Sequence, residues 1–309
     1  MTGVNHTQVT EFLLLGFKNI YVLNLVTFII FLLIYFLTLA GNLLIIIMVS
    51  KVQSLKAPMY FFLSHLSLSD ILLTSAITPN MLHVVLHGGA TISVKGCITQ
   101  LIFYSGNSAA ECLLLTVMSY DRYLAICNPL HYNSIMDLSL RLHLVLWSWV
   151  IAFMVALLLS IFLWQLQFYG AQTMDHYFCD LAPLLELTCS DHSTVQLVSF
   201  VLTIPLLILP FFFILFTYIS IFLSVLKINS ASGKKKAIST CSSHLIVVST
   251  YYGTLMNIYM VPSKGHAFNV NKLVSLLYTA LTPLSNPIIY SLRNQEIMGV
   301  LKKFLSMLR

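Results

Sequence analysis

Seven long stretches of this sequence contain almost no charged side chain, and this pattern constrains the fold more than any other feature. Each stretch is mostly apolar and long enough to cross a bilayer as a helix, which takes about 20 residues. Unbroken apolar runs of this length fit helices and not the short alternating strands of a membrane barrel. The predicted fold is therefore an all-α membrane protein, a bundle of seven transmembrane helices. The expected spans are residues 23–49, 59–80, 98–120, 142–163, 197–226, 238–261 and 273–292.

The composition supports this interpretation. Only 8% of the residues are charged and 58% are hydrophobic, whereas a soluble domain carries about 25% charged residues. So few charges could not cover a water-facing surface, so lipid must surround most of the chain. The N-terminal stretch lacks the basic start and small-residue cleavage site of a secretory signal peptide. The first span is therefore expected to act as an uncleaved signal anchor.

Lys and Arg divide unevenly between the two sides of the predicted spans, with 12 on one side and 4 on the other. Cytosolic connections are enriched in these residues, so the richer side is expected to face the cytosol. This places residues 1–22 outside the cell, 23–292 in the seven-span domain and the tail, residues 293–309, inside. Asn5 then lies outside in an Asn-His-Thr sequon for glycosylation, in agreement with this orientation.

The tail has a pattern of its own. Apolar residues recur at helical spacing between residues 297 and 308, with polar residues between them. This pattern predicts a short amphipathic helix that lies on the inner membrane surface.

Three cysteines fall on the outer side, where disulfides persist. Cys97 opens the third span, while Cys179 and Cys189 lie in the long loop between the fourth and fifth spans. A bond from Cys97 would draw this loop over the mouth of the bundle. Because three is an odd number, one cysteine stays free or pairs elsewhere. The residues alone do not choose between Cys179 and Cys189.

Asp70 and Glu111 are the acidic residues within the expected spans. A charge at this depth is costly and marks a candidate functional site. No Lys or Arg lies in the middle of a span to neutralise them. Either one or both carboxyl groups are protonated, with hydrogen bonds to neighbours such as Asn42, Ser67 or Asn286, or the two share a bound cation. Oxygen ligands would suit a hard ion such as sodium.

Prolines interrupt two of the expected spans. Pro205 and Pro210 fall in the fifth, and Pro283 and Pro287 in the seventh. Each removes a backbone hydrogen bond and favours a kink. Pro287 lies near the cytosolic end, where a hinge would change the inner face.

Four motifs, in order and on the expected faces of the membrane, carry a resemblance. They are PMYFFL at 58–63, MSYDRYLAIC at 118–127, KAISTCSSHL at 236–245 and PLSNPIIYSLRN at 283–294. Together they resemble the olfactory receptors, within the rhodopsin-like G-protein-coupled receptors. The resemblance extends from residue 10 to the tail, and the outer loop around residue 179 is similar to the class II, tetrapod-type branch.

The resemblance implies a receptor for a small, mostly apolar volatile odorant. It places the pocket between the third, fifth and sixth spans, where single polar residues are otherwise more often packing residues than ligand contacts. The candidate ligand contacts, which include Tyr252 at the position of an aromatic toggle, are Tyr104, Ser105, Ser108, Thr203, Tyr252, Met256, Tyr259 and Thr279.

The same resemblance implies a signalling role for the inner half. Arg122, next to Asp121, would hold the inactive inner face shut and then meet a stimulatory, olfactory-type heterotrimeric G protein that raises cyclic AMP. Tyr218 and Tyr290 would swing inward on activation. The full set of expected activation residues is Asp121, Arg122, Tyr123, Tyr218, His244, Asn286, Pro287 and Tyr290.

The resemblance also resolves two open choices. It implies a disulfide between Cys97 and Cys179, and it favours sodium at Asp70 and Glu111. Many relatives carry a further Cys near the position of Tyr169, and its absence here makes Cys189 an expected free thiol.

Other functions fit the sequence less well. A transporter would need a continuous polar path or repeated halves with broken helices, and the polar residues stop at the acidic pair. An enzyme would need a nucleophile–base set, a metal cluster or a phosphate loop. The expected location is the plasma membrane, and the expected partners are an odorant, the G protein and membrane lipid, without nucleic acid or a cofactor other than sodium.

Overall fold

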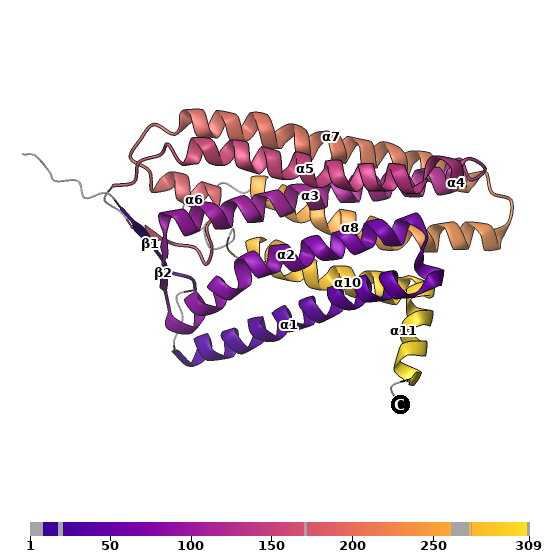
Figure 1. Cartoon of the computed structure of the whole chain (residues 1–309), viewed down its shortest axis with the longest axis horizontal. Helices are drawn as coiled ribbons and strands as arrows, with labels where there is room; N and C mark the ends of the chain where they lie inside the picture. The colour runs from indigo at the N-terminus through magenta and orange to yellow at the C-terminus, as the bar shows by residue number, and fades with distance from the viewer. Residues whose placement is uncertain (1–8, 18–20, 170–171, 261–271, 273, 308–309) are drawn as a thin grey trace, which may run out of the picture.

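The computed structural model describes residues 9–17, 21–169, 172–260, 272 and 274–307. Long helices lie side by side along the longest axis of the molecule (Figure 1), as predicted for a seven-helix bundle. They are α1 (Tyr21–Lys51), α2 (Pro58–His87), α3 (Val94–Cys127), α5 (Leu138–Leu163), α7 (Ser193–Leu226), α8 (Ala231–Met260), and η2 (Leu277–Leu281) continued by α10 (Thr282–Arg293). Shorter helices are η1 (Gln53–Leu55), α4 (Tyr132–Ile135), α6 (Leu181–Glu186) and α11 (Gln295–Met307). The all-α bundle and the helix in the tail are confirmed.

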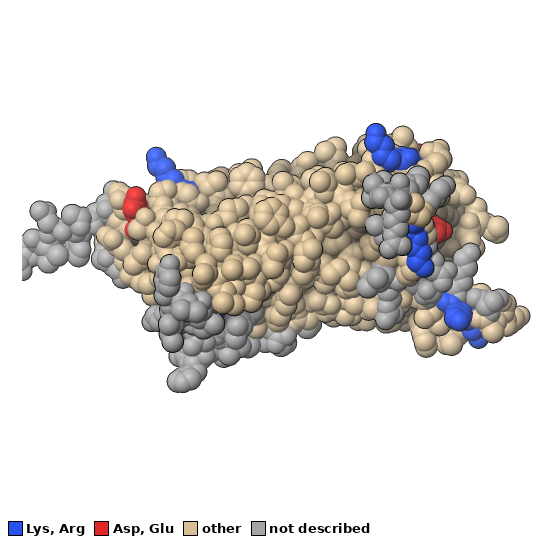
Figure 2. Space-filling model, turned by 90° about the horizontal axis from the view of Figure 1, so that it is seen from below, with Lys and Arg blue, Asp and Glu red and all other residues tan. Residues whose placement is uncertain are grey.

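The outer surface of the bundle is apolar. Five described helices, α1, α2, α3, α5 and α7, are long and apolar enough to cross a membrane by length and composition. Figure 2 shows a broad uncharged band between two ends at which charged residues gather. On α7, the side chains of Phe212, Phe216 and Phe222 are 59%, 61% and 62% exposed. Such a surface is suited to lipid, because a soluble monomer rarely exposes so large an apolar area.

Several helices extend beyond the predicted spans. α2 continues past residue 80 to His87 and ends where Gly88 adopts a left-handed conformation, with a φ of 70°. α8 begins at Ala231, before the expected start at residue 238. Hydropathy marks where the hydrocarbon ends, whereas backbone hydrogen bonding continues the helix into the interface. Local signals therefore set the helix ends, as at Gly88, which can take a positive φ without strain.

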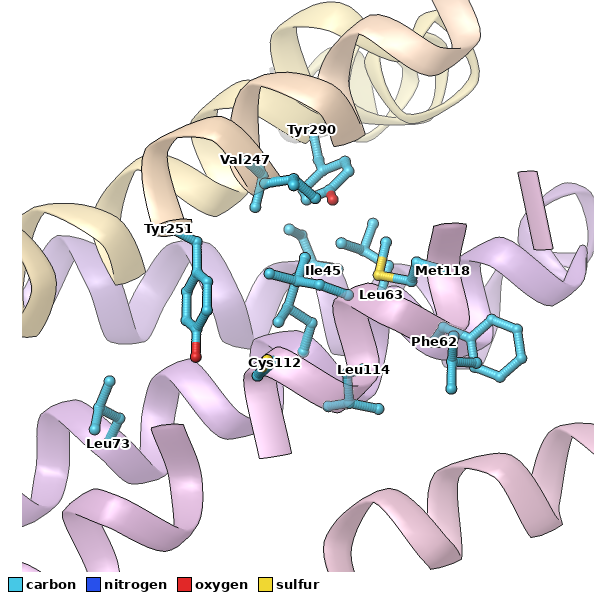
Figure 3. Close-up of a cluster of buried hydrophobic side chains, with 14 of the residues drawn as sticks. Ile45, Phe62, Leu63, Leu73, Cys112, Leu114, Met118, Val247, Tyr251 and Tyr290 are labelled. Carbon is cyan, nitrogen blue, oxygen red and sulfur yellow. The ribbon is translucent and has the colours of Figure 1, made fainter. Parts of the chain in front are cut away.

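The core lies around α3, which packs against α2, α5, α7 and α8, while α1 packs against α2 and α10. Figure 3 shows where these helices meet. Ile45 of α1, Leu63 of α2, Met118 of α3, Val247 of α8 and Tyr290 of α10 are all buried in one cluster.

At two prolines in the bundle, side chains of neighbouring helices replace the hydrogen bond that the proline cannot donate. Pro287 cannot donate to the carbonyl of Pro283, four residues earlier, and Asn42 of α1 supplies that bond through its Nδ2 at 3.0 Å. Pro210 likewise leaves the carbonyl of Leu206 without its helical donor, and the thiol of Cys112 on α3 donates to it at 3.3 Å. In lipid, where water cannot replace the lost bond, such donors keep a proline-containing helix intact.

The last span contains a wide helical turn. Residues 277–281 form a π-helix, and the N–H of Thr282 donates to the carbonyl of Leu277, five residues earlier. A π-turn of this kind accommodates one extra residue in a helix. It buries Tyr278, Thr279 and Ala280 in succession.

A small sheet at the outer end was not predicted. β1 (Glu11–Leu14) pairs antiparallel with β2 (Ala90–Ser93) and parallel with β3 (Thr173–Met174). Phe12 and Leu14 are fully buried, while the intervening Leu13 is exposed, as expected when side chains alternate along a strand. The sheet attaches the N-terminal segment to the loop before α3 and to the long outer loop.

Candidate functional site

A disulfide between Cys97 on α3 and Cys179 fixes the long outer loop over the bundle, and this confirms the expected pairing. The side chain of Gln100, about one turn after Cys97 on α3, adds a second attachment. Its Oε1 accepts a hydrogen bond from the backbone N–H of Cys179 at 2.9 Å, and its Nε2 donates to the carbonyl of Ala76 on α2 at 2.9 Å. Cys189 is free and exposed, as expected.

Two aromatic residues of this loop form the roof of the bundle. Tyr177 and Phe178 are fully buried. The ring of Tyr177 stacks on Phe17 with centroids 5.4 Å apart, and its hydroxyl lies 3.2 Å from the hydroxyl of Thr279. Phe178 meets the edge of Tyr104, with centroids 5.2 Å apart. The loop therefore contacts the residues expected to bind a ligand.

One face of α3 connects the roof to the core, because Tyr104, Ser108 and Cys112 recur every four residues. Ser108 is the centre of this face. Its hydroxyl accepts a hydrogen bond from Tyr278 of η2, and its backbone oxygen accepts one from Tyr251 of α8 at 2.8 Å. Ser108 thus joins three elements of the bundle.

Cys112 continues the connection inward. Its single thiol proton is donated to the carbonyl of Leu206, so the hydroxyl of Tyr252 must be the donor in its 3.1 Å contact with the sulfur. Tyr252 also packs on Phe211 of α7, with centroids 5.2 Å apart. Cys112 and Tyr252 therefore connect α3 and α8 to α7 at the level of Pro210.

The other expected ligand contacts are placed differently. The hydroxyl of Ser105 donates to a carbonyl of its own helix at 2.7 Å, and Thr203 is half-buried on α7. Thr279 is buried and contacts the roof. The side chains of Met256 and Tyr259, like Asn5, lie outside the described residues.

Charged groups surround the roof on its outer side. The ammonium group of Lys272 is buried and lies 2.6 Å from Asp175, and it also donates to the carbonyl of Gly16 at 3.0 Å. Burial and the Lys272 charge lower the pKa of His176 to about 3. Burial raises the pKa of Asp180 above its usual value, although its carboxylate accepts the N–H of Leu181 at the start of α6.

The acidic pair lies in the middle of the bundle. Asp70 and Glu111 are 0% and 1% exposed, and the amide of Asn286 donates to both oxygens of Asp70, at 3.1 and 3.0 Å. Among the described residues, Glu111 Oε1, Asn107 Oδ1 and Asn286 Oδ1 have no hydrogen-bond partner. Oxygen atoms of this kind fit a hard cation.

At the inner end, Arg122 forms an ion pair with the neighbouring Asp121. The hydroxyl of Tyr132 on α4 donates to the other carboxylate oxygen of Asp121 at 2.8 Å. Burial and this carboxylate raise the pKa of Tyr132 above its usual value, so the phenol keeps its proton. Tyr132 therefore connects the second inner loop to the ion pair.

The expected switch residues lie beside this ion pair. The hydroxyl of Tyr218 on α7 lies 2.6 Å from Nδ1 of His244 on α8, and the two rings stack. Within the described part of the chain, His244 Nε2 and the hydroxyl of Tyr290 have no hydrogen-bond partner. Tyr123 packs against a small inner cluster that includes Cys241. Pro287 packs closely on Gly41, where an added Cβ would lie 3.1 Å from the proline ring.

An open apolar groove of about 450 Å³ lies elsewhere, between α2 and α5. Its lining includes Leu68, Leu72, Leu142 and Leu146, which are exposed on the outside of the bundle. The groove therefore faces lipid and is separate from the expected ligand contacts.

Comparison with known proteins decides the family. A family model described as "Olfactory receptor" matches residues 31–307. Human olfactory receptor 10A7 is 44% identical over 97% of this chain and 95% of its own. The chain belongs to the olfactory receptor family. Human olfactory receptor 11A1 is 45% identical over 99% of this chain and 96% of its own, and mouse olfactory receptor 1J1 is 45% identical over 98% and 96%.

This olfactory receptor shares its fold with squid rhodopsin. The crystal structure of squid rhodopsin superposes with a TM-score of 0.74 over 93% of this chain and 82% of the other, at 18% identity. This likeness shows the fold, whereas membership of the olfactory receptor family shows that the chain is a multi-pass membrane receptor of the G-protein-coupled type and not an enzyme.

Sequence reasoning missed several residues of this olfactory receptor. Tyr251 was not singled out because it precedes Tyr252, and two adjacent helical residues point about 100° apart. In the structure both rings reach α3, Tyr251 at Ser108 and Tyr252 at Cys112, and nothing in the sequence shows this. Tyr132, Tyr177 and Tyr278 were missed for a related reason, since their partners lie in other elements.

Proposed function

We propose that this receptor binds a small, mostly apolar, neutral odorant in the outer half of the bundle. Binding activates a stimulatory, olfactory-type G protein and raises cyclic AMP. The receptor resides in the plasma membrane, with the N-terminus outside and the C-terminal tail in the cytosol. The proposed ligand contacts carry hydroxyl groups and no charge, so an alcohol, aldehyde, ketone or ester fits better than a carboxylic acid.

The position of Ser108 carries the proposal. It accepts hydrogen bonds from Tyr251 of α8 and Tyr278 of η2, and Tyr104, which touches the roof, lies one turn before it. A ligand beside Tyr104 and Ser108 would change the contacts that hold α8 and η2 to α3. Contacts on this face of α3 therefore connect ligand binding to the elements that lead to the inner end.

The mechanism is a shift between two populations. A ligand shifts the equilibrium only by the difference in its affinity for the two states. In the inactive state, Arg122 is paired with Asp121, and Tyr218 is paired with His244. Release of these pairs as the inner ends of α7 and α8 separate would free Arg122 to meet the G protein.

The acidic pair, Asp70 and Glu111, would bind a sodium ion in the inactive state. Asp70, Glu111, Asn107 and Asn286 would supply oxygen ligands, and the ion would offset the charge of two buried carboxylates. Sodium there would hold α2, α3 and α10 together below the ligand site.

The test compares Ser108 on α3 with Ser160 on α5. Ser108→Ala removes the acceptor of the Tyr278 hydroxyl, and an unpaired buried hydroxyl costs about 1–3 kcal/mol. If this cost falls on one of the two states, the concentration of odorant that gives a half-maximal cyclic-AMP response should change about fivefold or more. Ser160→Ala is the matched control, because the buried Ser160 hydroxyl donates to a carbonyl of its own helix and is not a proposed ligand contact.

The assay uses cells that co-express the olfactory G protein, an odorant panel and measured surface expression. Equal responses of the two variants would contradict the role of Ser108. Silence toward every odorant, at normal surface expression, would contradict the odorant function. A receptor with Arg122→Ala should reach the surface and give no cyclic AMP.

A further inference from the structure

Two histidines lie on one face of α2 at its outer end. His83 and His87 are four residues apart, so their side chains stand one above the other on the helix. Both are exposed, and their ring centroids are 4.4 Å apart. The activity proposed above does not use either residue.

The pair lies beyond the hydrocarbon. The second span was expected to end at residue 80, and α2 continues to His87. At 1.5 Å per residue, His83 and His87 lie about 4.5 Å and about 10.5 Å further along the helix. The imidazole rings are therefore accessible to ions of the extracellular fluid.

A hydrogen bond prepares one ring to bind a metal. Nδ1 of His87 lies 2.9 Å from the backbone carbonyl oxygen of His83. A carbonyl oxygen can only accept, so Nδ1 carries the proton and the lone pair of neutral His87 is on Nε2. Metal-binding histidines commonly donate their other ring N–H to a backbone carbonyl in this way.

The spacing of the rings allows both to reach one ion. A metal–imidazole bond is about 2.0–2.1 Å long, so two nitrogens on one ion stand roughly 3 Å apart. Rings whose centroids are 4.4 Å apart reach this separation by small side-chain rotations. Neutral imidazoles on a helix at this spacing suit Cu²⁺ and Zn²⁺ better than Mg²⁺ or Ca²⁺, which prefer oxygen.

The geometry points to a binding site for one divalent transition-metal ion, Cu²⁺ or Zn²⁺, at His83 and His87. Water completes the coordination, since the described residues hold no group of three or more His, Cys, Asp or Glu that could bind a metal. The ion would join the last turn of α2, next to the Gly88–Gly89 turn that leads into β2. Because both ligands belong to α2, the ion would stabilise the last turn of this helix.

The experiment uses the full-length receptor in lipid nanodiscs, purified without a polyhistidine tag. Cu²⁺ alone is the first probe, and electron paramagnetic resonance counts the nitrogen ligands of the ion. One tight Cu²⁺ per receptor with two nitrogen ligands is expected. Zn²⁺ should displace it and should raise the unfolding temperature of the receptor.

The variants His83→Ala and His87→Ala should each lose the tight site and the temperature shift, because a chelate needs both ligands. His192→Ala, which changes another histidine of the outer side, should retain both. Since His83 and His87 are exposed, each variant should unfold at the normal temperature without metal. Tight binding that survives both substitutions, or a Cu²⁺ signal with one nitrogen in the unaltered receptor, would overturn the assignment.

Discussion

Gln100 should contribute strongly to the stability of the outer half, because its one amide group bonds both to the long outer loop and to α2. It is 8% exposed, and its Oε1 accepts the N–H of Cys179, a residue with no exposed surface. Gln100→Leu keeps much of the volume of the side chain and removes the acceptor. The carbonyl of Ala76 keeps its helical donor, but the N–H of Cys179 loses its acceptor.

The size of the effect can be worked out from these contacts. A buried N–H without a partner costs about 1–3 kcal/mol, so Gln100→Leu should destabilise the receptor by about 2 kcal/mol. For chains of about 150–250 residues, 1 kcal/mol lowers the unfolding temperature by about 2–4 °C. A decrease of about 4–8 °C is expected on this scale. Gln196→Leu is the matched control, because Gln196 is exposed at the outer end of α7, where substitutions usually change stability by less than about 0.5 kcal/mol.

A thiol-reactive dye provides the assay. Cys112 and Cys241 are buried and free, so the dye reacts with them as the bundle opens, and the purified receptor can be heated in detergent or nanodiscs. If Gln100→Leu and Gln196→Leu lower the unfolding temperature equally, the bond from Gln100 to Cys179 does not hold the loop and the reasoning fails.

Two further predictions concern other loops. Tyr132→Phe removes the hydroxyl that donates to Asp121, and a bond to a charged acceptor is worth about 1.5–3 kcal/mol. Basal cyclic AMP should therefore rise several-fold at equal surface expression. An unchanged basal level would show that Tyr132 does not stabilise the ion pair of Asp121 and Arg122. The pKa of His176 is lowered to about 3 in the folded receptor, below its ordinary value of about 6.5, so the unfolded chain binds more protons between these values and stability should fall as the pH decreases from about 6.5 toward 3. His176→Phe should flatten this dependence in unfolding scans at several pH values, and an equal slope in both proteins would contradict the burial of a neutral imidazole.

The bundle could be predicted from the sequence because lipid imposes a simple rule. Each span must be apolar and must satisfy its own backbone hydrogen bonds, so charge-free stretches locate the helices directly. The position of Asp70 within a span also marked it as a candidate site. These conclusions depend on local composition, which one sequence contains.

The contacts between spans could not be predicted in the same way. Asp70 and Asn286 are 216 residues apart, and the carbonyls freed by Pro210 and Pro287 find donors on other helices. Such pairs depend on how each helix is rotated about its axis. The outer sheet was missed because β1 has only four residues and its partners lie far along the chain.

The wide turn at residues 277–281 sets how far one half of the last span is rotated about the helix axis relative to the other half. One extra residue in a helix rotates the segment before it by about 100° relative to the segment after it. Tyr278 and Thr279 lie within the turn and face α3 and the roof, whereas Asn286 and Tyr290 follow it and face the acidic pair and the inner core. Deleting a single residue there would leave both halves helical and would rotate the proposed ligand contact Thr279 relative to the proposed activation residues Asn286 and Tyr290.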